Sequence, residues 1–263
     1  MATTTTEKLR EATTWGLRFT DAADIKHVAD ALLDGYRGKD GEYPLVVTPN
    51  VDIMITLEDA DSRVRETVNR AAVVLADGQP LVSFSRFAGD SLQTRLAGSD
   101  LTAAMWPQLV AENRATFAIA PTPMVIERLA MEHQNFDAIA APMLPAEAGS
   151  LIDRFAWETI QRIAAMSELP EFVFLGVGFS KDVLIARSIL EQWPAELGEP
   201  PVLVAVGASL EFITGLKKRA PEIYQRLGVE FLHRMMSDPK RLMKRYLVRD
   251  ARFLLIMMRH MRA

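Results

Sequence analysis

The chain has 263 residues, of which 49% are hydrophobic and 24% are charged, as in an ordinary folded protein with one large domain or a domain and an appendage. It has no cysteine, which excludes disulfides, thiol catalysis and cysteine-ligated zinc. No apolar run reaches the roughly 18 residues of a membrane-spanning helix, and the first residues lack the apolar core of a signal peptide. We therefore expect a protein that does not cross a membrane.

Charge is distributed unevenly along the chain. Residues 217–263 contain 13 Lys and Arg against 4 Asp and Glu, a balance of +9, whereas the whole chain carries -4. The preceding 216 residues must therefore carry -13. This asymmetry predicts that the C-terminal tail meets an anionic partner.

Short apolar runs alternate with amphipathic segments as far as residue 210. Strands are expected at 15–20, 45–47, 71–76, 115–120, 136–140, 172–177 and 202–206. A helix is expected at about 21–36, another begins at about 61, and a short helical segment after the strand at 71–76 ends at 87. A further helix should run from an N-cap at Ser99 or Asp100 to about 113, and others are expected at 124–133, 151–166 and 181–192. This alternation predicts an α/β fold with a Rossmann-like, doubly wound, mostly parallel sheet. We assign 1–14 to a flexible N-terminus and 15–210 to the α/β domain.

The pattern changes after residue 210, where consecutive helices are expected at 222–227, 230–236, 239–247 and 251–261. We assign 211–263 to a basic helical appendage. Lys and Arg alternate there with apolar residues, as in helices that lie on anionic membrane surfaces. Two alternatives are a helical pair docked on the domain and a nucleic-acid binder, although the aromatic residues typical of single-strand binders are few.

An apolar run from Ala71 to Ala76 ends abruptly at Asp77-Gly78. Ligands of open α/β sheets bind beyond the carboxyl ends of strands, so Asp77 is a candidate functional residue. Gly78 is expected to allow a tight turn and the close approach of a ligand. The alternative is that Asp77 caps the helix that follows.

Other polar and glycine-rich turns follow the predicted strands. Gly176-Val177-Gly178 and Gly207 precede expected helices, as phosphate-binding turns do, and Thr48 and Asn50 follow another strand, where simple turn chemistry is the alternative. Asp59-Ala60-Asp61 matches the aspartate pair with which many sugar transferases hold a metal, but a solvated helix start explains it better. The four histidines lack ligand spacing, and no metal site is predicted.

Taken in order, several motifs resemble the WecG/TagA/CpsF family of bacterial glycosyltransferases (glycosyltransferase family 26). The matching motifs are Val47-Thr48-Pro49-Asn50, Leu75-Ala76-Asp77-Gly78, Arg95-Leu96-Ala97-Gly98-Ser99-Asp100-Leu101, Phe174-Leu175-Gly176-Val177-Gly178, Val206-Gly207-Ala208, Gly215-Leu216-Lys217-Lys218-Arg219-Ala220-Pro221 and Leu227-Gly228-Val229-Glu230-Phe231-Leu232-His233-Arg234. Asp238-Pro239-Lys240-Arg241 and Arg245-Tyr246-Leu247 follow, so the resemblance runs from about residue 15 to the end.

The resemblance implies an inverting enzyme without an obligatory metal or other cofactor. Its donor is a UDP-sugar (UDP-N-acetylmannosamine, its uronic acid or UDP-glucose), and its acceptor is a sugar on a polyprenyl diphosphate. The family's roles fall on Asp77 as general base, with Thr48 and Asn50 beside it, and on Arg95 at the diphosphate. Substrate binding is further implied for Gly78, Gly176, Gly178, Gly207 and Arg219.

Asp182 is a further candidate catalytic residue by its position, but it is a departure from the family, which usually has a glutamine of the active site there. A non-catalytic nucleotide-sugar-binding module is therefore the alternative function. The resemblance also implies that the tail docks on the inner face of the cell membrane from the cytoplasm, through Arg241, Lys244, Arg245 and Arg249. An anionic membrane surface is thus an expected partner and nucleic acid is not, while homo-oligomer formation is left open.

Overall fold

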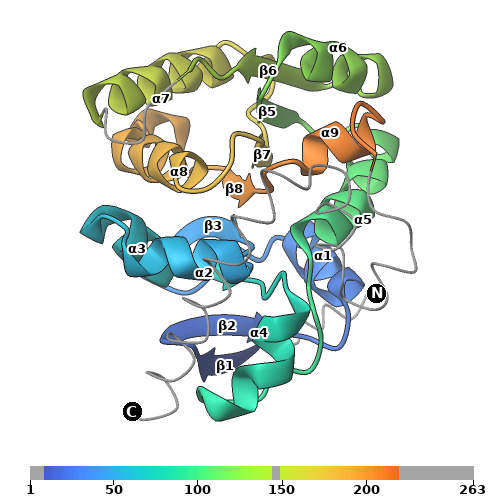
Figure 1. The fold of residues 1–263 in the computed structure, drawn as a ribbon. Helices are drawn as coiled ribbons and strands as arrows, with labels where there is room; N and C mark the ends of the chain where they lie inside the picture. The colour runs from blue at the N-terminus through green and yellow to red at the C-terminus, as the bar shows by residue number, and fades with distance from the viewer. Residues whose placement is uncertain (1–8, 144–148, 219–263) are drawn as a thin grey trace, which may run out of the picture.

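Six parallel strands form the main sheet of residues 9–143 and 149–218, the parts of the chain that the computed structural model describes (Figure 1). They are β3 (Tyr43–Val47), β4 (Ala71–Val74), β5 (Thr116–Ala120), β6 (Phe136–Ala140), β7 (Phe172–Leu175) and β8 (Val202–Ala205). Their order in the sheet is β4-β3-β8-β7-β5-β6, and every neighbouring pair is parallel. The predicted Rossmann-like, mostly parallel sheet is confirmed.

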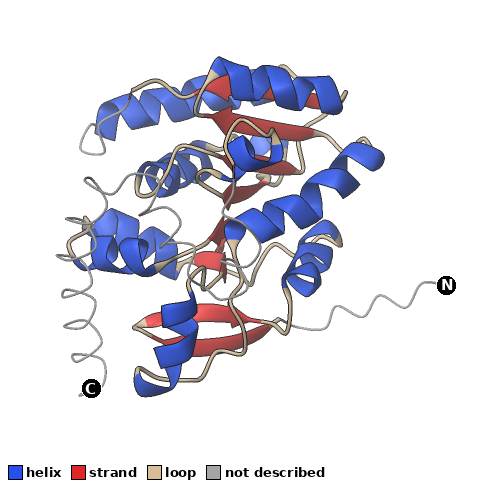
Figure 2. Ribbon diagram, turned by 45° about the vertical axis from the view of Figure 1, so that its right-hand side comes forward, coloured by secondary structure: helices blue, strands red, loops and turns tan. Residues whose placement is uncertain are grey.

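Helices cover both faces of this sheet, which gives three layers (Figures 1 and 2). One face carries α2 (Val51–Glu58), α3 (Ser62–Asn69), α7 (Gly149–Ala164) and α8 (Lys181–Gln192), and the other carries α1 (Ile25–Leu33), α5 (Gly98–Ala111), α6 (Pro123–Glu132) and α9 (Ser209–Ile213). A short 3-10 helix, η2 (Ala195–Leu197), precedes β8.

The central strands β7 and β8 are apolar throughout because both of their faces are buried. Along β8, Leu203 and Ala205 face the core under α8, while Val202 and Val204 face the core under α5. The same alternation places Phe117 of β5 on one side and Ala118 on the other. Period-two alternation in strands without a polar face therefore builds two separate cores.

A smaller antiparallel sheet lies beside the main one and consists of β1 (Arg10–Thr14) and β2 (Leu17–Asp21). Trp15 and Gly16 join the two strands with positive φ angles of 56° and 70°, as in the type I′ turns that suit a two-residue hairpin loop. In Figures 1 and 2 the hairpin lies below the sheet, together with α4 (Gln79–Phe84) and the 3-10 helix η1 (Ser85–Phe87).

Several predicted boundaries need correction. Strand β1 occupies five residues of the segment that we assigned to a flexible N-terminus, and the predicted edge strand at 15–20 is the turn and most of β2. Helix α5 begins at Gly98 with Ala97 as its N-cap, so Ser99 and Asp100 lie inside it. Asp100 instead sits in the first turn, where a carboxylate interacts favourably with the helix dipole.

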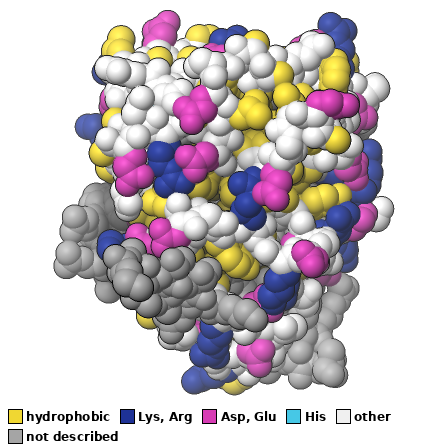
Figure 3. Space-filling view, turned by 180° about the vertical axis from the view of Figure 1, so that it is seen from behind, with side chains coloured by type: hydrophobic (Ala, Val, Ile, Leu, Met, Phe, Trp, Pro, Cys, Tyr) yellow, Lys and Arg dark blue, Asp and Glu magenta, His cyan; other side chains and the backbone are white. Residues whose placement is uncertain are grey.

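The helices predicted at 222–261 lie outside the described residues. Within the described part, none of the helices is long and apolar enough to cross a membrane. Figure 3 shows one face of the molecule, on which basic and acidic side chains lie interspersed around hydrophobic ones. Ion pairs such as Arg154–Glu158 and Arg187–Glu66 join side chains of opposite charge in the fold, at 2.9 and 2.8 Å.

The direction of winding reverses within the sheet. From β3 the chain passes outward to β4 at one edge, and from β5 it passes outward to β6 at the other edge, with β7 and β8 between them. Ligands of open α/β sheets bind beyond the carboxyl ends of strands near such a reversal. The loops after β4, β3, β8 and β7 are therefore the place to look for a site.

Candidate active site

Asp77 lies three residues beyond the end of β4 and is held by its neighbours on both sides. Its backbone N–H donates to the carbonyl of Pro49, at 2.8 Å, which ties it to the loop after β3. Its Oδ1 accepts from Nε of Arg95 at 3.4 Å, and the two side chains are 25% and 15% exposed. The structure thus pairs the predicted general base with the predicted diphosphate-binding cation.

Asp77 does not cap the next helix. Gly78 is the N-cap of α4, and no side-chain hydrogen bond caps that helix. The capping alternative is therefore wrong, because the carboxylate points to Arg95 and not to the first turn of α4. This leaves Asp77 as a partly exposed carboxylate at the carboxyl edge of the sheet.

The tight turn that Gly78 is expected to allow is not found either, because the backbone at Gly78 is extended. Its φ of -174° is extended backbone that any residue adopts. A Cβ built on Gly78 would lie 3.8 Å from its nearest neighbours, among them the Cα of Asn50, which is ordinary contact. The remaining argument for glycine at this position is the space that it leaves beside Asp77.

Thr48 and Asn50 follow β3 and lie next to the Asp77 loop. Thr48 Oγ1 is 3.5 Å from the carbonyl oxygen of Ala205, and Asn50 Oδ1 accepts from the N–H of Ile53 at 3.0 Å and so caps α2. A Cβ on Gly98 would come within 2.8 Å of Thr48 Oγ1. Gly98 therefore lets α5 approach Thr48 closely. The sequence around Gly98 does not indicate this role, because the contact is made with a distant residue.

The glycine turns after β7 and β8 meet each other. A Cβ on Gly176 would lie 2.9 Å from Leu210 Cδ1 and 3.3 Å from both the Gly207 carbonyl and Pro121 Cδ, so three loops close around this glycine. Gly178 and Gly207 have φ angles of +87° and +51°, where side chains are disfavoured. The backbone at both turns therefore needs glycine, and the first turn leads into the N-terminus of α8.

Asp182 lies in the first turn of α8 and is 4% exposed. Its Oδ1 accepts a hydrogen bond from the N–H of Val183 at 2.8 Å. Burial raises the pKa of Asp182 to about 7, against the opposing effect of the backbone hydrogen bonds. The side chain is therefore enclosed in the fold and not presented to a ligand in this structure.

The other predicted residues separate into two groups. Arg219, Arg241, Lys244, Arg245 and Arg249 lie outside the described residues. Asp61 caps α3 by accepting from the N–H of Arg63 at 2.8 Å, which confirms the helix-start interpretation of the aspartate pair. Within the described ranges, no cluster of three or more metal-ligating side chains occurs.

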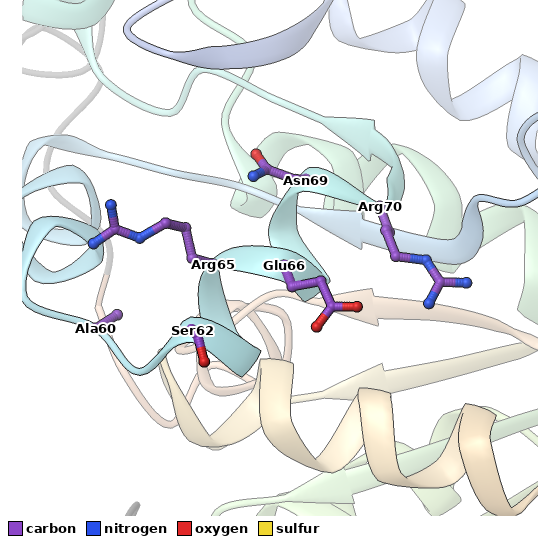
Figure 4. Close-up of a pocket in the computed structure, with 6 residues that line it drawn as sticks. All are labelled: Ala60, Ser62, Arg65, Glu66, Asn69 and Arg70. Atoms are coloured by element: carbon purple, nitrogen blue, oxygen red, sulfur yellow. The ribbon is translucent and has the colours of Figure 1, made fainter.

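A shallow, open depression on α3 lies apart from these loops (Figure 4). Its charged side chains are engaged by the fold: Glu66 pairs with Arg187 at 2.8 Å, and Arg70 donates to the hydroxyl of Tyr43 at 2.8 Å. Arg65 donates to the carbonyl of Glu58 at 2.7 Å. The depression therefore belongs to the packing of α3, and the carboxyl edge of the sheet remains the candidate site.

Comparison with protein-family models identifies the family of the chain. The model of the Glycosyl transferase WecG/TagA/CpsF family matches residues 13–263. The chain belongs to this family. For a WecG/TagA/CpsF glycosyltransferase, the substrates are a sugar donor and an acceptor. The paired Asp77 and Arg95 lie at the carboxyl edge, where ligands of doubly wound sheets generally bind.

Proposed function

We propose that this protein is an inverting glycosyltransferase that moves a hexose or N-acetylhexosamine from a UDP-sugar to a sugar carried on a polyprenyl diphosphate. UDP-N-acetylmannosamine, its uronic acid and UDP-glucose are the donors we consider. The observation that supports the proposal most strongly is the pairing of Asp77 with Arg95 beyond β4, in a chain of this family. The pathway would be the synthesis of a bacterial surface or exported polysaccharide.

In this proposal Asp77 is the general base. Its carboxylate accepts the proton of the acceptor hydroxyl while the hydroxyl oxygen attacks the anomeric carbon from the face opposite to the UDP. The bond between the anomeric carbon and the UDP oxygen breaks, and UDP departs with the electron pair. Attack from the opposite face inverts the anomeric configuration. Asp77 is suited to this role because it is partly exposed and fixed through its own backbone.

Departing UDP needs positive charge and N–H donors. We propose that the guanidinium of Arg95 turns from Asp77 toward the diphosphate when the donor binds, since its planar fork suits phosphate oxygens. The glycine turn at Gly176–Gly178, which leads into the N-terminus of α8, would supply backbone N–H groups. In this arrangement a metal ion is not required for transfer.

A polyprenyl acceptor stays in the bilayer, so the enzyme must bring its site to the membrane surface. We propose that the appendage 211–263 binds the anionic inner face of the cell membrane through Arg241, Lys244, Arg245 and Arg249, which lie outside the described residues. Each such cation near an anionic leaflet contributes about 1 kcal/mol, and salt weakens the attraction.

The decisive experiment is a transfer assay with the three UDP-sugars and a panel of lipid-linked acceptors, with and without EDTA. Inverted product that forms in EDTA supports the proposal, and strict dependence on a divalent cation contradicts its metal-free part. Binding of UDP without transfer to any acceptor would favour a nucleotide-sugar-binding module instead.

The membrane part has its own test, which is flotation with vesicles that contain anionic lipid. Replacing Arg241, Lys244, Arg245 and Arg249 with glutamate should abolish flotation and leave the circular dichroism of the α/β body unchanged. Equal flotation of this variant and the wild type would contradict the membrane role of the tail.

A further inference from the structure

The N-terminal hairpin contacts the segment that runs between the two members of the Asp77–Arg95 pair. The indole Nε1 of Trp15 donates to the carbonyl of Leu81 in α4 at 3.1 Å, and Thr14 Oγ1 donates to the carbonyl of Ser85 in η1 at 3.0 Å. The Trp15 N–H also donates to the carbonyl of Ala88 at 3.2 Å. The hairpin, α4 and η1 lie together in Figures 1 and 2.

Trp15 itself indicates that these contacts matter. It occupies the first position of the type I′ turn with a φ of 56°, where asparagine is the locally favoured residue and a bulky side chain is strained. Its side chain is nonetheless 2% exposed and bound to α4. Contact with α4 therefore outweighs local turn preference at this position.

Asp21, the last residue of β2, makes the contact nearest to Arg95. Its side chain is 1% exposed, and its Oδ1 accepts from the backbone N–H of Gln93 at 2.9 Å. Its Oδ2 accepts from Nε2 of Gln93 at 3.1 Å and lies 3.5 Å from Nε of Arg10. A buried carboxylate thus binds Gln93 twice, at a separation of 72 residues along the chain.

Arg95 lies between two such fixed points. Two residues before it, Gln93 is bound to Asp21, and one residue after it, the N–H of Leu96 donates to the carbonyl of Ala76 at 3.0 Å. The hairpin also holds the strand that leads to Asp77, because Thr20 Oγ1 accepts from the N–H of Val74 at 3.3 Å. The hairpin is therefore hydrogen-bonded both to the strand that leads to Asp77 and to the segment that leads to Arg95.

We propose that Asp21 is a positioning residue, which sets the place of Arg95 relative to Asp77 by binding Gln93. It touches neither substrate nor reacting atoms. A short, doubly bound and buried anchor reduces the freedom of the Arg95 loop before the donor arrives, and supporting contacts of this kind keep a site within its working geometry. The proposal rests on the proposed function where it assigns Arg95 to the donor diphosphate.

The test exchanges donor and acceptor across the contact. Asp21→Leu keeps a similar side-chain size but removes both acceptor oxygens, so the Gln93 N–H and Nε2 lose their acceptors. Gln93→Glu places two carboxylates against each other and leaves the hairpin unchanged. In the double variant Asp21→Asn with Gln93→Glu, the Asn amide can donate to the new carboxylate, and complementarity is restored. Asp90→Asn is the matched control. Asp90 Oδ2 accepts a hydrogen bond from the Thr13 N–H at 2.8 Å, and the amide oxygen of asparagine can accept the same bond.

Two readouts separate the inference from the proposed function. Amide hydrogen exchange of the peptide that spans 92–97 should become at least about 10-fold faster in the single variants Asp21→Leu and Gln93→Glu, since about 10-fold is the factor for one lost hydrogen bond, and should recover in the double variant. The dissociation constant for UDP, measured by calorimetry, should rise by about 10-fold in the single variants and recover in the double. Asp90→Asn should change neither.

If exchange in 92–97 stays at the wild-type rate in both single variants, the positioning role of Asp21 is wrong. The same conclusion follows if the double variant is no closer to wild type than the single ones. If Asp21→Leu does not fold, Gln93→Glu and the double variant decide the question alone. A wild-type protein that does not bind UDP would instead overturn the proposed function, while the exchange data would still decide whether Asp21 holds the loop.

Discussion

Two aspartate–arginine pairs in this protein differ in a way that separates a candidate site from the supporting fold. Asp77 and Arg95, at the carboxyl edge, have side chains only 25% and 15% exposed, yet Nε and Oδ1 are 3.4 Å apart. Asp137 of β6 and Arg162 of α7 are 34% and 50% exposed, yet form a two-pronged contact of 2.7 and 2.9 Å. The Asp137–Arg162 pair therefore has the shorter hydrogen bonds, although it is the more exposed pair and water competes more strongly for its charges.

This difference is the reverse of what stability alone favours. A partly buried ion pair needs good geometry to offset the loss of hydration, while an exposed pair contributes little in any geometry. The proposed function accounts for a long contact in the more enclosed position, because it has Arg95 exchange partners when the donor binds. Changes to each pair, and to the groups that surround them, test this explanation.

The largest effect is expected for Asp77→Asn. Asparagine keeps the size of the side chain but cannot take a proton from an acceptor hydroxyl, so the rate of transfer should fall on the order of 10²–10⁴-fold. UDP binding should change little, because the proposal assigns the diphosphate to Arg95. Transfer kinetics and UDP calorimetry measure the two effects, with Asp137→Asn as the matched control at the other pair. Full turnover by Asp77→Asn would refute the assignment of the base.

The next effect concerns Asp182, whose pKa is raised to about 7 by burial. In the unfolded chain this carboxyl ionises near its usual pKa of about 3.9, so between about pH 4 and 7 only the unfolded state releases the proton. The contribution of Asp182 to stability should therefore fall as the pH rises through this interval and stay constant above it. The asparagine of the Asp182→Asn variant cannot ionise, so this variant should not show this loss of stability as the pH rises from about 4 to 7.

Urea unfolding at pH 5 and pH 8 measures this effect. The Asn variant should be more stable than the wild type at pH 8, by a few kcal/mol at most, and the difference should shrink toward pH 5. A difference that does not change with pH would contradict the raised pKa. Retained transfer activity in the same variant would show that the buried carboxyl is not needed for the reaction.

Gly176→Ala should have a smaller but clear effect on stability. Its Cβ would lie 2.9 Å from Leu210 Cδ1, in a fully buried side chain, and 3.3 Å from a backbone carbonyl, so the loops after β7 and β8 must shift. Overpacking of this kind costs about 1–3 kcal/mol. Gly78→Ala is the matched control, since its Cβ meets nothing closer than 3.8 Å. Equal unfolding free energies for the two variants would show that the packing around Gly176 can relax.

The sequence predicts the sheet and its two helical layers well because buried parallel strands and amphipathic helices leave strong local patterns. Helix α8 and strand β6 have the predicted ends, Lys181–Gln192 and Phe136–Ala140. The strand order is not predictable in the same way, since it depends on crossovers between segments far apart. Likewise, Asp77 can be found from its place after an apolar run, as a candidate for the edge where ligands bind.

Contacts across long separations account for what the sequence alone does not show. The pairing of Asp77 with Arg95 depends on the path of the loop between them, and Asp21 gains its role only from Gln93, 72 residues away. The burial of Asp182 is set by the packing of α8, whereas an aspartate in the sequence is normally expected to be exposed. The Trp15-Gly16 turn was missed for a local reason, because tryptophan is a poor signal for a type I′ turn.

The smallest effect is expected for Asp137→Asn, at the pair with the better geometry. Burial alone would raise the pKa of Asp137, but hydrogen bonds from Arg162 and from the Ala138 N–H lower it below its usual value. The carboxylate form therefore stabilises the fold at pH 7, and this contribution is lost as the pH falls through the lowered pKa. Because both side chains are about a third or more exposed, water screens the pair and its loss should cost at most about 1 kcal/mol. Thermal unfolding at pH 7 and pH 3 should show a small difference from the wild type that shrinks at the lower pH, and the transfer rate should be unchanged. A large loss of transfer in Asp137→Asn, with the fold intact, would mean that the better-formed pair also serves the reaction and that geometry does not distinguish the two.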